Sequence, residues 1–167
     1  MLRLTWILLF CCLLLVSCAP SDPSVAQSET SSTESLAQEL PISAEVEMGG
    51  ETIKLEVART QKQKAVGLMY REELPPNRGM LFPMNPPQVP RFWMKNVQIP
   101  LDIIFVREGK IEAIAHQLPP CPEEPCQIYT PNVVIDQVIE LRGGRAKELG
   151  LNIGDSVSVE EYSTEKQ

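Results

Sequence analysis

The chain has 167 residues, of which 43% are apolar and 22% charged, as is usual for one globular domain. Its formal net charge is −7 and no stretch concentrates Lys and Arg, which argues against binding to nucleic acid or, by charge, to an anionic membrane surface. The composition by itself indicates no activity.

The N-terminus is typical of an export signal. Arg3 gives a positive start, and residues 4–16 form an apolar run that is too short for a permanent transmembrane helix. Residues 15–18 (Leu-Val-Ser-Cys) resemble the lipobox of bacterial lipoproteins. We therefore expect a signal peptide over 1–17, lipidation at Cys18, and an extracytoplasmic protein anchored to a bacterial membrane by its lipid. An ordinary secretory signal and an uncleaved anchor are the alternatives.

The segment after the signal is polar. Residues 18–40 are rich in Ser, Thr, Gln, Glu and Pro and lack apolar periodicity, which predicts a disordered tether behind the lipidated cysteine. A short helix over 34–40 is the structured alternative. The folded domain is expected over 41–162, followed by a disordered tail at 163–167.

The first half of the domain combines a hairpin with a helix. Residues 42–48 and 52–57 alternate apolar and polar side chains on either side of a Gly-Gly pair, which predicts a β-hairpin. Residues 60–69 have helical composition with Thr60 as the N-cap, and 75–79 form a turn.

The second half is mostly strand. Strands are expected over 101–106, 111–115, 133–141 and 156–160, with one or two helical turns over 143–149. Many short strands, few helices and no strand–helix repeat predict a mainly β fold. We expect a single small closed or half-closed antiparallel barrel or sandwich with one or two short helices.

Prolines are concentrated in two stretches. Seven lie within 75–100 and five within 119–131. Because proline cannot donate a hydrogen bond to a strand ladder, both stretches are expected to be rigid surface loops or edges. Such loops on a β scaffold are where a binding site is expected.

Few residues suggest metal or catalytic chemistry. His116 is the only histidine, and no metalloprotease, nucleophile-elbow, Walker or dinucleotide motif occurs. Cys121 and Cys126, in a Pro-rich loop of an exported protein, are expected to form a disulfide. The alternative is a copper or zinc site made by His116 with both cysteines. No cofactor is otherwise indicated.

Four methionines fall within a short stretch: Met69, Met80, Met84 and Met94. Exported copper proteins use thioether ligands, so a Cu(I) site is one interpretation. Their apolar neighbours favour packing in the core instead.

One set of motifs is specific. It comprises residues 67–71 (Gly-Leu-Met-Tyr-Arg), 79–82 (Gly-Met-Leu-Phe), 92–96 (Phe-Trp-Met-Lys-Asn), 99–105 (Ile-Pro-Leu-Asp-Ile-Ile-Phe), 138–141 (Val-Ile-Glu-Leu), 143–144 (Gly-Gly) and 154–155 (Gly-Asp). Over about 42–159 the chain resembles the bacterial and archaeal family called Domain of Unknown Function 192. The resemblance implies a compact, mainly β fold and no established activity. Val97 stands where the family usually has Thr.

Asp102 begins the most apolar strand, where a carboxylate needs polar partners. The nearest candidates by motif are Lys95, Asn96 and Arg71, which favours a structural tie between Asp102 and the preceding loop. The functional alternative is a small polar ligand pocket walled by Trp93 and lined by these same four residues. Arg59 and Glu140 are secondary members of that predicted pocket.

These observations favour a lipid-anchored, non-enzymatic binding or accessory module for a small ligand or an envelope partner. Two alternatives stay open. One is a carboxylate-centred hydrolase of an envelope component, built around Asp102. The other is a protein that binds copper or zinc through sulfur ligands. The sequence does not indicate an oligomeric state.

Overall fold

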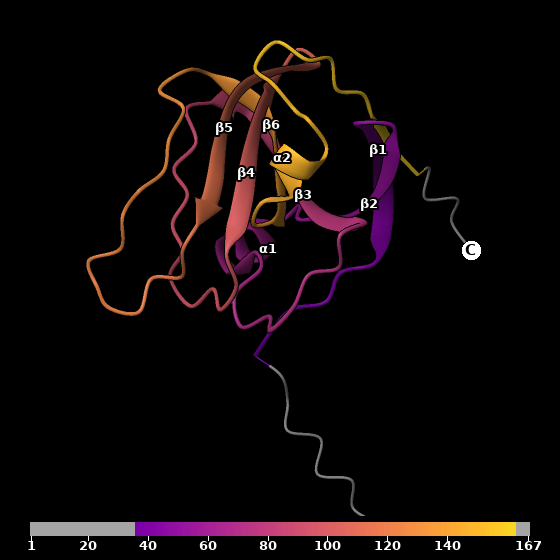
Figure 1. Cartoon of the computed structure of the whole chain (residues 1–167). Helices are drawn as coiled ribbons and strands as arrows, with labels where there is room; N and C mark the ends of the chain where they lie inside the picture. The colour runs from indigo at the N-terminus through magenta and orange to yellow at the C-terminus, as the bar shows by residue number, and fades with distance from the viewer. Residues whose placement is uncertain (1–35, 163–167) are drawn as a thin grey trace, which may run out of the picture. The chain divides into compact units, whose positions relative to one another are not determined.

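The structure is a computed structural model that describes residues 36–162 (Figure 1). The predicted signal peptide, the lipidation site at Cys18, most of the tether and the tail at 163–167 lie outside these residues. Among the helices described, none is long and apolar enough to cross a membrane.

Seven strands of the described domain form one sheet in the order β5-β4-β6-β3-β2-β1-β7. The strands are β1 (Ile42–Met48), β2 (Glu51–Val57), β3 (Arg78–Gln88), β4 (Leu101–Arg107), β5 (Lys110–Leu118), β6 (Ile135–Arg142) and β7 (Val159–Glu161). Two short helices, α1 (Gln61–Val66) and α2 (Arg145–Glu148), complete the fold. The sheet ends at β5 and β7 without closing, so the predicted mainly β fold is confirmed in its half-closed form.

The predicted hairpin forms between β1 and β2. Met48 pairs with Glu51, which leaves Gly49 and Gly50 as a two-residue turn. Both glycines have positive φ, 57° and 78°. Residues with a side chain rarely adopt such backbone angles, whereas glycine does so readily. A two-residue turn with positive φ at both positions matches the right-handed twist of the two strands.

One strand pair departs from the antiparallel prediction. β2 and β3 are parallel, with Val57 opposite Leu81, and α1 lies in the connection between them. A parallel pair needs a long crossover, and residues 58–77 supply it. α1 begins after Thr60, whose side chain and that of Gln63 form a capping box, and it ends before Gly67, earlier than predicted.

β3 was not predicted as a strand because of its proline content. Residues 78–88 lie in the stretch expected to be surface loops or edges, yet they form an eleven-residue strand inside the sheet, between β6 and β2. The pairing with β2 stops at Leu81, and the pairing with β6 shifts register between Pro83 and Gln88. Pro83 still pairs with Gln137 of β6, but it lies beyond the end of the β2 ladder and at the last regular pair before the register shift, where the loss of one donor interrupts little of the sheet.

Both faces of the central strands are buried. On one face, β1, β2 and the outer part of β6 pack with α2 in a cluster that includes Ile53, Ile104 and Ile139. On the other face, Phe82, Ile103 and other side chains pack beneath the loops around α1 and residues 90–99. Strands buried on two faces read as continuous apolar runs, as β4 does.

The last residues of the expected tether are bonded to the domain. The Gln38 side chain donates hydrogen bonds of 2.8 Å to the carbonyl groups of Gln63 and Gly67. The Leu40 N–H donates to Glu56 Oε2 at 2.8 Å. The structured region therefore begins several residues before position 41, because side chains of the domain accept and donate bonds to this segment.

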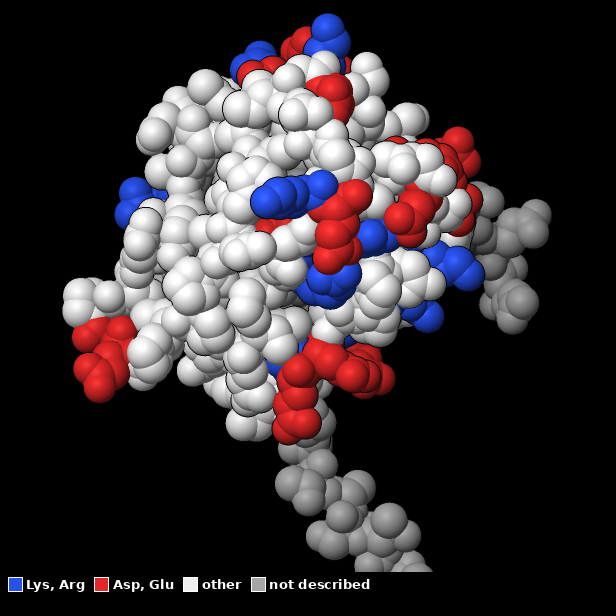
Figure 2. Space-filling view, in the orientation of Figure 1, with Lys and Arg blue, Asp and Glu red and all other residues white. Residues whose placement is uncertain are grey.

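Charged side chains are scattered over the face shown in Figure 2. The basic residues on it form no continuous stripe, and several lie beside acidic residues. This face therefore has no charge pattern of the kind that binds a phosphate backbone.

Candidate ligand-binding pocket

A pocket of about 370 Å³ lies between α1, the end of β3 and the loop that follows it. Its volume is within the range of small-molecule sites. Apolar side chains form most of its wall: Leu68, Met69, Phe82, Met84, Val89, Phe92, Trp93 and Val97. The charged side chains that line it are Lys64, Arg91 and Glu140.

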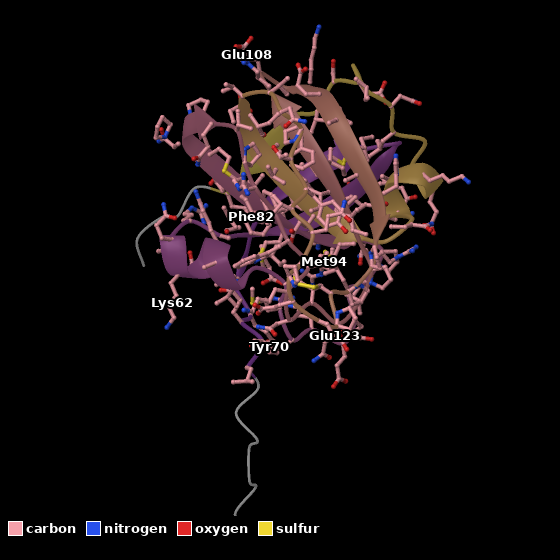
Figure 3. All side chains as sticks on the ribbon, turned by 90° about the vertical axis from the view of Figure 1, so that its left-hand side faces the viewer. Lys62, Tyr70, Phe82, Met94, Glu108 and Glu123 are labelled. Atoms are coloured by element: carbon pink, nitrogen blue, oxygen red, sulfur yellow. A yellow bond between two sulfur atoms is a disulfide. The ribbon has the colours of Figure 1, made fainter. Side chains whose placement is uncertain are left out.

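The aromatic part of the wall is rigidly packed. Phe92 meets Phe82 edge to face, with 5.3 Å between ring centroids, and Phe105 at 6.2 Å. Reciprocal backbone hydrogen bonds with Tyr129 fix Phe92 in place. Figure 3 shows Phe82 and Met94 within the body of the domain, with Tyr70 and Glu123 at the end opposite Glu108. Trp93 is 48% exposed, so its ring is available to an occupant.

Gly67 lines the pocket. It ends α1 with a φ of 51°, a backbone angle that residues with a side chain rarely adopt. A Cβ atom at this position would meet the ring of Phe82 at 3.4 Å. The absence of a side chain at residue 67 therefore lets the end of α1 lie directly against the buried Phe82 ring at the base of the pocket.

Glu140 is the acidic residue of the pocket. It belongs to β6, where it pairs with Met80 of β3 and Ile103 of β4, so its side chain shares a face with apolar neighbours. It is only 5% exposed. Among the described residues, no hydrogen bond or ion pair reaches its carboxyl group. A buried acid without a partner is costly, and such a group commonly marks a functional site.

Burial changes the protonation of Glu140. Removal from water raises its pKa from the ordinary value of 4.5 to about 8. At neutral pH the group is therefore mostly a neutral carboxylic acid, which can donate one hydrogen bond and accept others.

Two basic side chains accompany Glu140 in the lining. The Lys64 ammonium donates to the carbonyl of Pro83, which holds it at the β3 side. Arg91 is exposed, and no ion pair involves it among residues 36–162. Neither is bonded to Glu140.

Asp102 lies elsewhere. It is completely buried, and its carboxylate accepts three backbone hydrogen bonds: from Gln117 at 2.7 Å, Gly144 at 2.9 Å and Ala146 at 2.7 Å. The last two donors belong to the start of α2, so Asp102 caps this helix from a distant strand. The expected tie to Lys95 and Asn96 is therefore wrong, because backbone N–H groups of β5 and α2 satisfy the carboxylate instead.

Arg71 also has a different partner. Its guanidinium makes a bidentate ion pair with Glu56, at 2.7 and 2.6 Å, and both side chains are largely buried. It also donates to the Gln38 carbonyl at 2.6 Å. Arg71 therefore fastens the segment before β1 to the crossover between β2 and β3.

The other predicted pocket residues are dispersed. Lys95 pairs with Glu124, and its Nζ lies 5.8 Å from the centroid of the Trp93 ring. The Asn96 amide is 3.9 Å from the sulfur of Met69. Arg59 forms an exposed ion pair with Glu161. Of the residues predicted for a ligand pocket, only Trp93 and Glu140 line this one.

The sulfur atoms of Cys121 and Cys126 are 2.13 Å apart, as in a disulfide. With both sulfurs bonded to each other, neither is a thiolate ligand in this structure. His116 is exposed on β5. The described residues contain no group of three or more His, Cys, Asp or Glu side chains placed to hold a metal ion. The four methionines belong to the apolar packing around Phe82 or lie against it.

Sequence reasoning missed most of the pocket wall. Phe82 and Met84 come from the unpredicted strand β3, and Gly67 from the end of a helix expected to be longer. The signal for Glu140 was present: it is the one acidic residue inside the apolar run 138–141. An acidic residue in a strand buried on both faces indicates either a structural bond, as for Asp102, or a site.

Comparison with known proteins agrees with this fold. A family model described as "Uncharacterized ACR", DUF192, matches residues 44–159. The chain belongs to the DUF192 family. Two solved structures resemble this DUF192 domain, and comparison with curated proteins finds no match.

The first of these structures is a protein of unknown function from Novosphingobium aromaticivorans. It is 38% identical, with 70% of this chain and 83% of that chain covered and a TM-score of 0.63. The second, from Sinorhizobium meliloti, is described as a candidate transcription regulator. It is 32% identical, with 73% of this chain and 98% of that chain covered and a TM-score of 0.65.

Proposed function

We propose that this DUF192 protein is a lipid-anchored, extracytoplasmic module that binds a small apolar ligand in the pocket between Trp93 and Glu140. One observation carries the proposal. Glu140, a residue that is only 5% exposed and whose carboxyl group has no partner among the described residues, lines a pocket whose walls are otherwise mainly apolar. Sites that bind small molecules typically combine such walls with a few polar groups that orient the ligand.

The anchor is supported by the sequence alone. Residues 15–18 provide the lipobox-like junction, and the polar segment behind it separates the domain from the membrane. The overall negative charge and the absence of a clustered basic stretch in the sequence favour a small ligand or an envelope partner over nucleic acid.

We do not propose a hydrolase centred on Asp102. Its carboxylate is completely buried and bonded to three backbone N–H groups, so a substrate has no access to it.

Trp93 provides the test. The chain has two tryptophans, Trp6 and Trp93, and a Trp6→Phe substitution leaves Trp93 as the only one whether or not the predicted signal peptide is cleaved. With this protein in lipid nanodiscs, small apolar molecules bearing amine, hydroxyl or carboxyl groups are titrated while Trp93 emission is recorded. We expect at least one compound to shift the emission saturably.

A matched pair of variants locates the binding. Ala65 is an exposed residue of α1 that lines the pocket, and Lys62 is exposed on the same helix but does not line it. Ala65→Phe should abolish the shift and Lys62→Phe should preserve it. A shift that survives Ala65→Phe, or no shift with any compound, would contradict the proposal.

A further inference from the structure

We propose that the occupant of this pocket is a small apolar amine, whose ammonium group pairs with the Glu140 carboxylate. The inference rests on the proposed function, since it assigns a chemical class to the ligand of the same pocket. Two observations support it: the neighbours of Glu140 are apolar, and no described residue in the pocket pairs with its carboxyl group.

The surroundings of Glu140 offer it no donor. On β3 and β4 its register partners are Met80 and Ile103. The residues packed over this face from the loops include Leu68, Met94 and Val97, all apolar. An ionised carboxylate here is unfavourable unless a donor or cation arrives from outside the chain. An ammonium group supplies both a positive charge and N–H donors to the carboxylate oxygens.

The walls suit the rest of such a ligand. Phe92 and Trp93 present aromatic surface to an apolar body, with Phe82 buried beside Phe92, and aromatic faces also attract cations. Lys64 from α1 and Arg91 from the loop after β3 are the other charged groups of the lining. Neither contacts Glu140, so they do not replace the missing partner. If the ligand also has an acidic group, the positive charges of Lys64 and Arg91 favour it at a position away from Glu140.

The inference makes a specific prediction about pH. Because the free protein holds Glu140 mostly protonated below its pKa of about 8, an amine that binds the carboxylate must displace that proton. The share of protein ready to bind therefore rises with pH. Apparent affinity should increase roughly fiftyfold between pH 6 and pH 8 and then level off. A simple alkyl amine stays charged in this range, because such amines titrate near pH ~10.

Three probes of similar shape separate the ligand classes: benzylamine, benzyl alcohol and benzoate. Each is titrated into the full Trp6→Phe chain in phosphatidylglycerol nanodiscs at pH 6, 7 and 8, with Trp93 emission as the readout. Ala65→Phe serves as the control for partition into the lipid. We expect benzylamine to bind most tightly and to gain affinity with pH, whereas benzoate should lose affinity or fail to bind.

Glu140→Gln provides the decisive variant. It keeps the shape of the side chain but cannot ionise, so benzylamine should bind at least tenfold more weakly at pH 8 and without pH dependence. Folding of this variant is checked by its thermal midpoint. Glu112→Gln, on an exposed part of β5, is the matched control and should change nothing.

The outcomes distinguish the two proposals. Tighter pocket binding by benzyl alcohol or benzoate than by benzylamine would overturn the amine assignment and leave the pocket in place. So would pH-independent binding of benzylamine. If none of the probes, and none of the compounds in the wider titration, gives a shift that Ala65→Phe removes, the pocket itself is not a ligand site.

An ammonium group could come from a free amine or from a phosphatidylethanolamine headgroup. Nanodiscs that contain phosphatidylethanolamine separate these sources. If the headgroup occupies the pocket, benzylamine should bind more weakly in those discs than in phosphatidylglycerol alone. If a free amine is the ligand, the two lipid compositions should give the same affinity.

Discussion

Asp102 and Glu140 lie one register position apart on the adjacent strands β4 and β6, on opposite faces of the sheet, and their surroundings are opposite in kind. Ile103, the neighbour of Asp102, pairs with Glu140. Asp102 accepts three backbone hydrogen bonds, whereas Glu140 has no bonded partner in the described chain. One carboxyl group therefore stabilises the fold, and the other is left available to a ligand.

The structural role of Asp102 predicts a loss of stability on substitution. Asp102→Asn keeps the shape but replaces one acceptor oxygen by a donor that faces N–H groups. The free energy of unfolding should fall by about 1–3 kcal/mol, measured by urea denaturation. Asp136→Asn is the control, since its carboxylate accepts one exposed bond from Glu108, and its effect should be smaller. Equal stability of Asp102→Asn and wild type would contradict the helix-capping role.

Burial of Glu140 should make the stability of the protein depend on pH in the opposite direction to the effect of a salt-bridged acid. Its pKa is 4.5 in the unfolded chain and about 8 in the folded one, so the folded state holds the proton between these values. Stability therefore falls as pH rises from 4.5 to 8, by up to about 1.4 kcal/mol per pH unit. Glu140→Gln removes this term. Its stability relative to wild type should increase steadily in urea denaturation at pH 5, 6, 7 and 8, and a constant difference would argue against burial of the acid.

The Arg71–Glu56 pair predicts a non-additive result. Arg71→Met leaves the Glu56 carboxylate buried without its cation, which should cost about 3–5 kcal/mol of stability. The double variant with Glu56→Gln should recover part of this loss. Because both residues hold residues 38–40, the single variant should also expose this segment to proteases. Additive losses in the double variant would contradict coupling between the two side chains.

The disulfide predicts a local effect. Cys121 and Cys126 close a short loop, so replacing both by Ala should lower stability by about 2 kcal/mol. The backbone of Cys121 bonds to Met94, next to Trp93, and Lys95 is bridged to Cys121. Trp93 emission should therefore change in the double variant while far-ultraviolet circular dichroism is retained. An unchanged emission spectrum would mean that the Trp93 wall does not depend on this loop.

The lipid anchor predicts a change of location. Cys18→Ala removes the thiol that would carry acyl chains, so the chain should leave the membrane fraction or remain unprocessed. Fractionation and intact mass measure both effects. Ser17→Ala is a conservative control beside the same junction. If fractionation is unchanged and the mass of Cys18→Ala differs from wild type only by the substituted side chain, the protein is not a lipoprotein.

The sequence predicted features that depend on local pattern. The β1–β2 hairpin, the Thr60 cap and the buried strand β4 each follow from neighbouring residues, and all three are present. The predicted disulfide also concerns residues close in sequence. What failed depends on contacts between distant residues. The parallel β2–β3 pair is set by the crossover, and Pro83 of β3 lies past the end of the β2 ladder and at the last regular pair with β6.

The same distinction explains the pocket. Motif proximity grouped Asp102 with Lys95 and Asn96, but β4 places Asp102 on the α2 face, away from that loop. The sequence indicated Glu140 only as a secondary pocket residue. What distinguishes it is that neither β3 nor β4, the strands on either side of β6, provides a partner for its carboxyl group. A single sequence does not display a missing bond.

The hydrogen bonds of Gln38 have a mechanical consequence. The Gln38 amide is bonded to the carbonyl of Gly67, and Gly67 lines the pocket. A pulling force applied to the chain at residue 36 therefore loads this bond and the Arg71 contact to Gln38 before it reaches β1. Tension on the N-terminal side is therefore transmitted to the pocket wall at Gly67 before it is transmitted to the sheet.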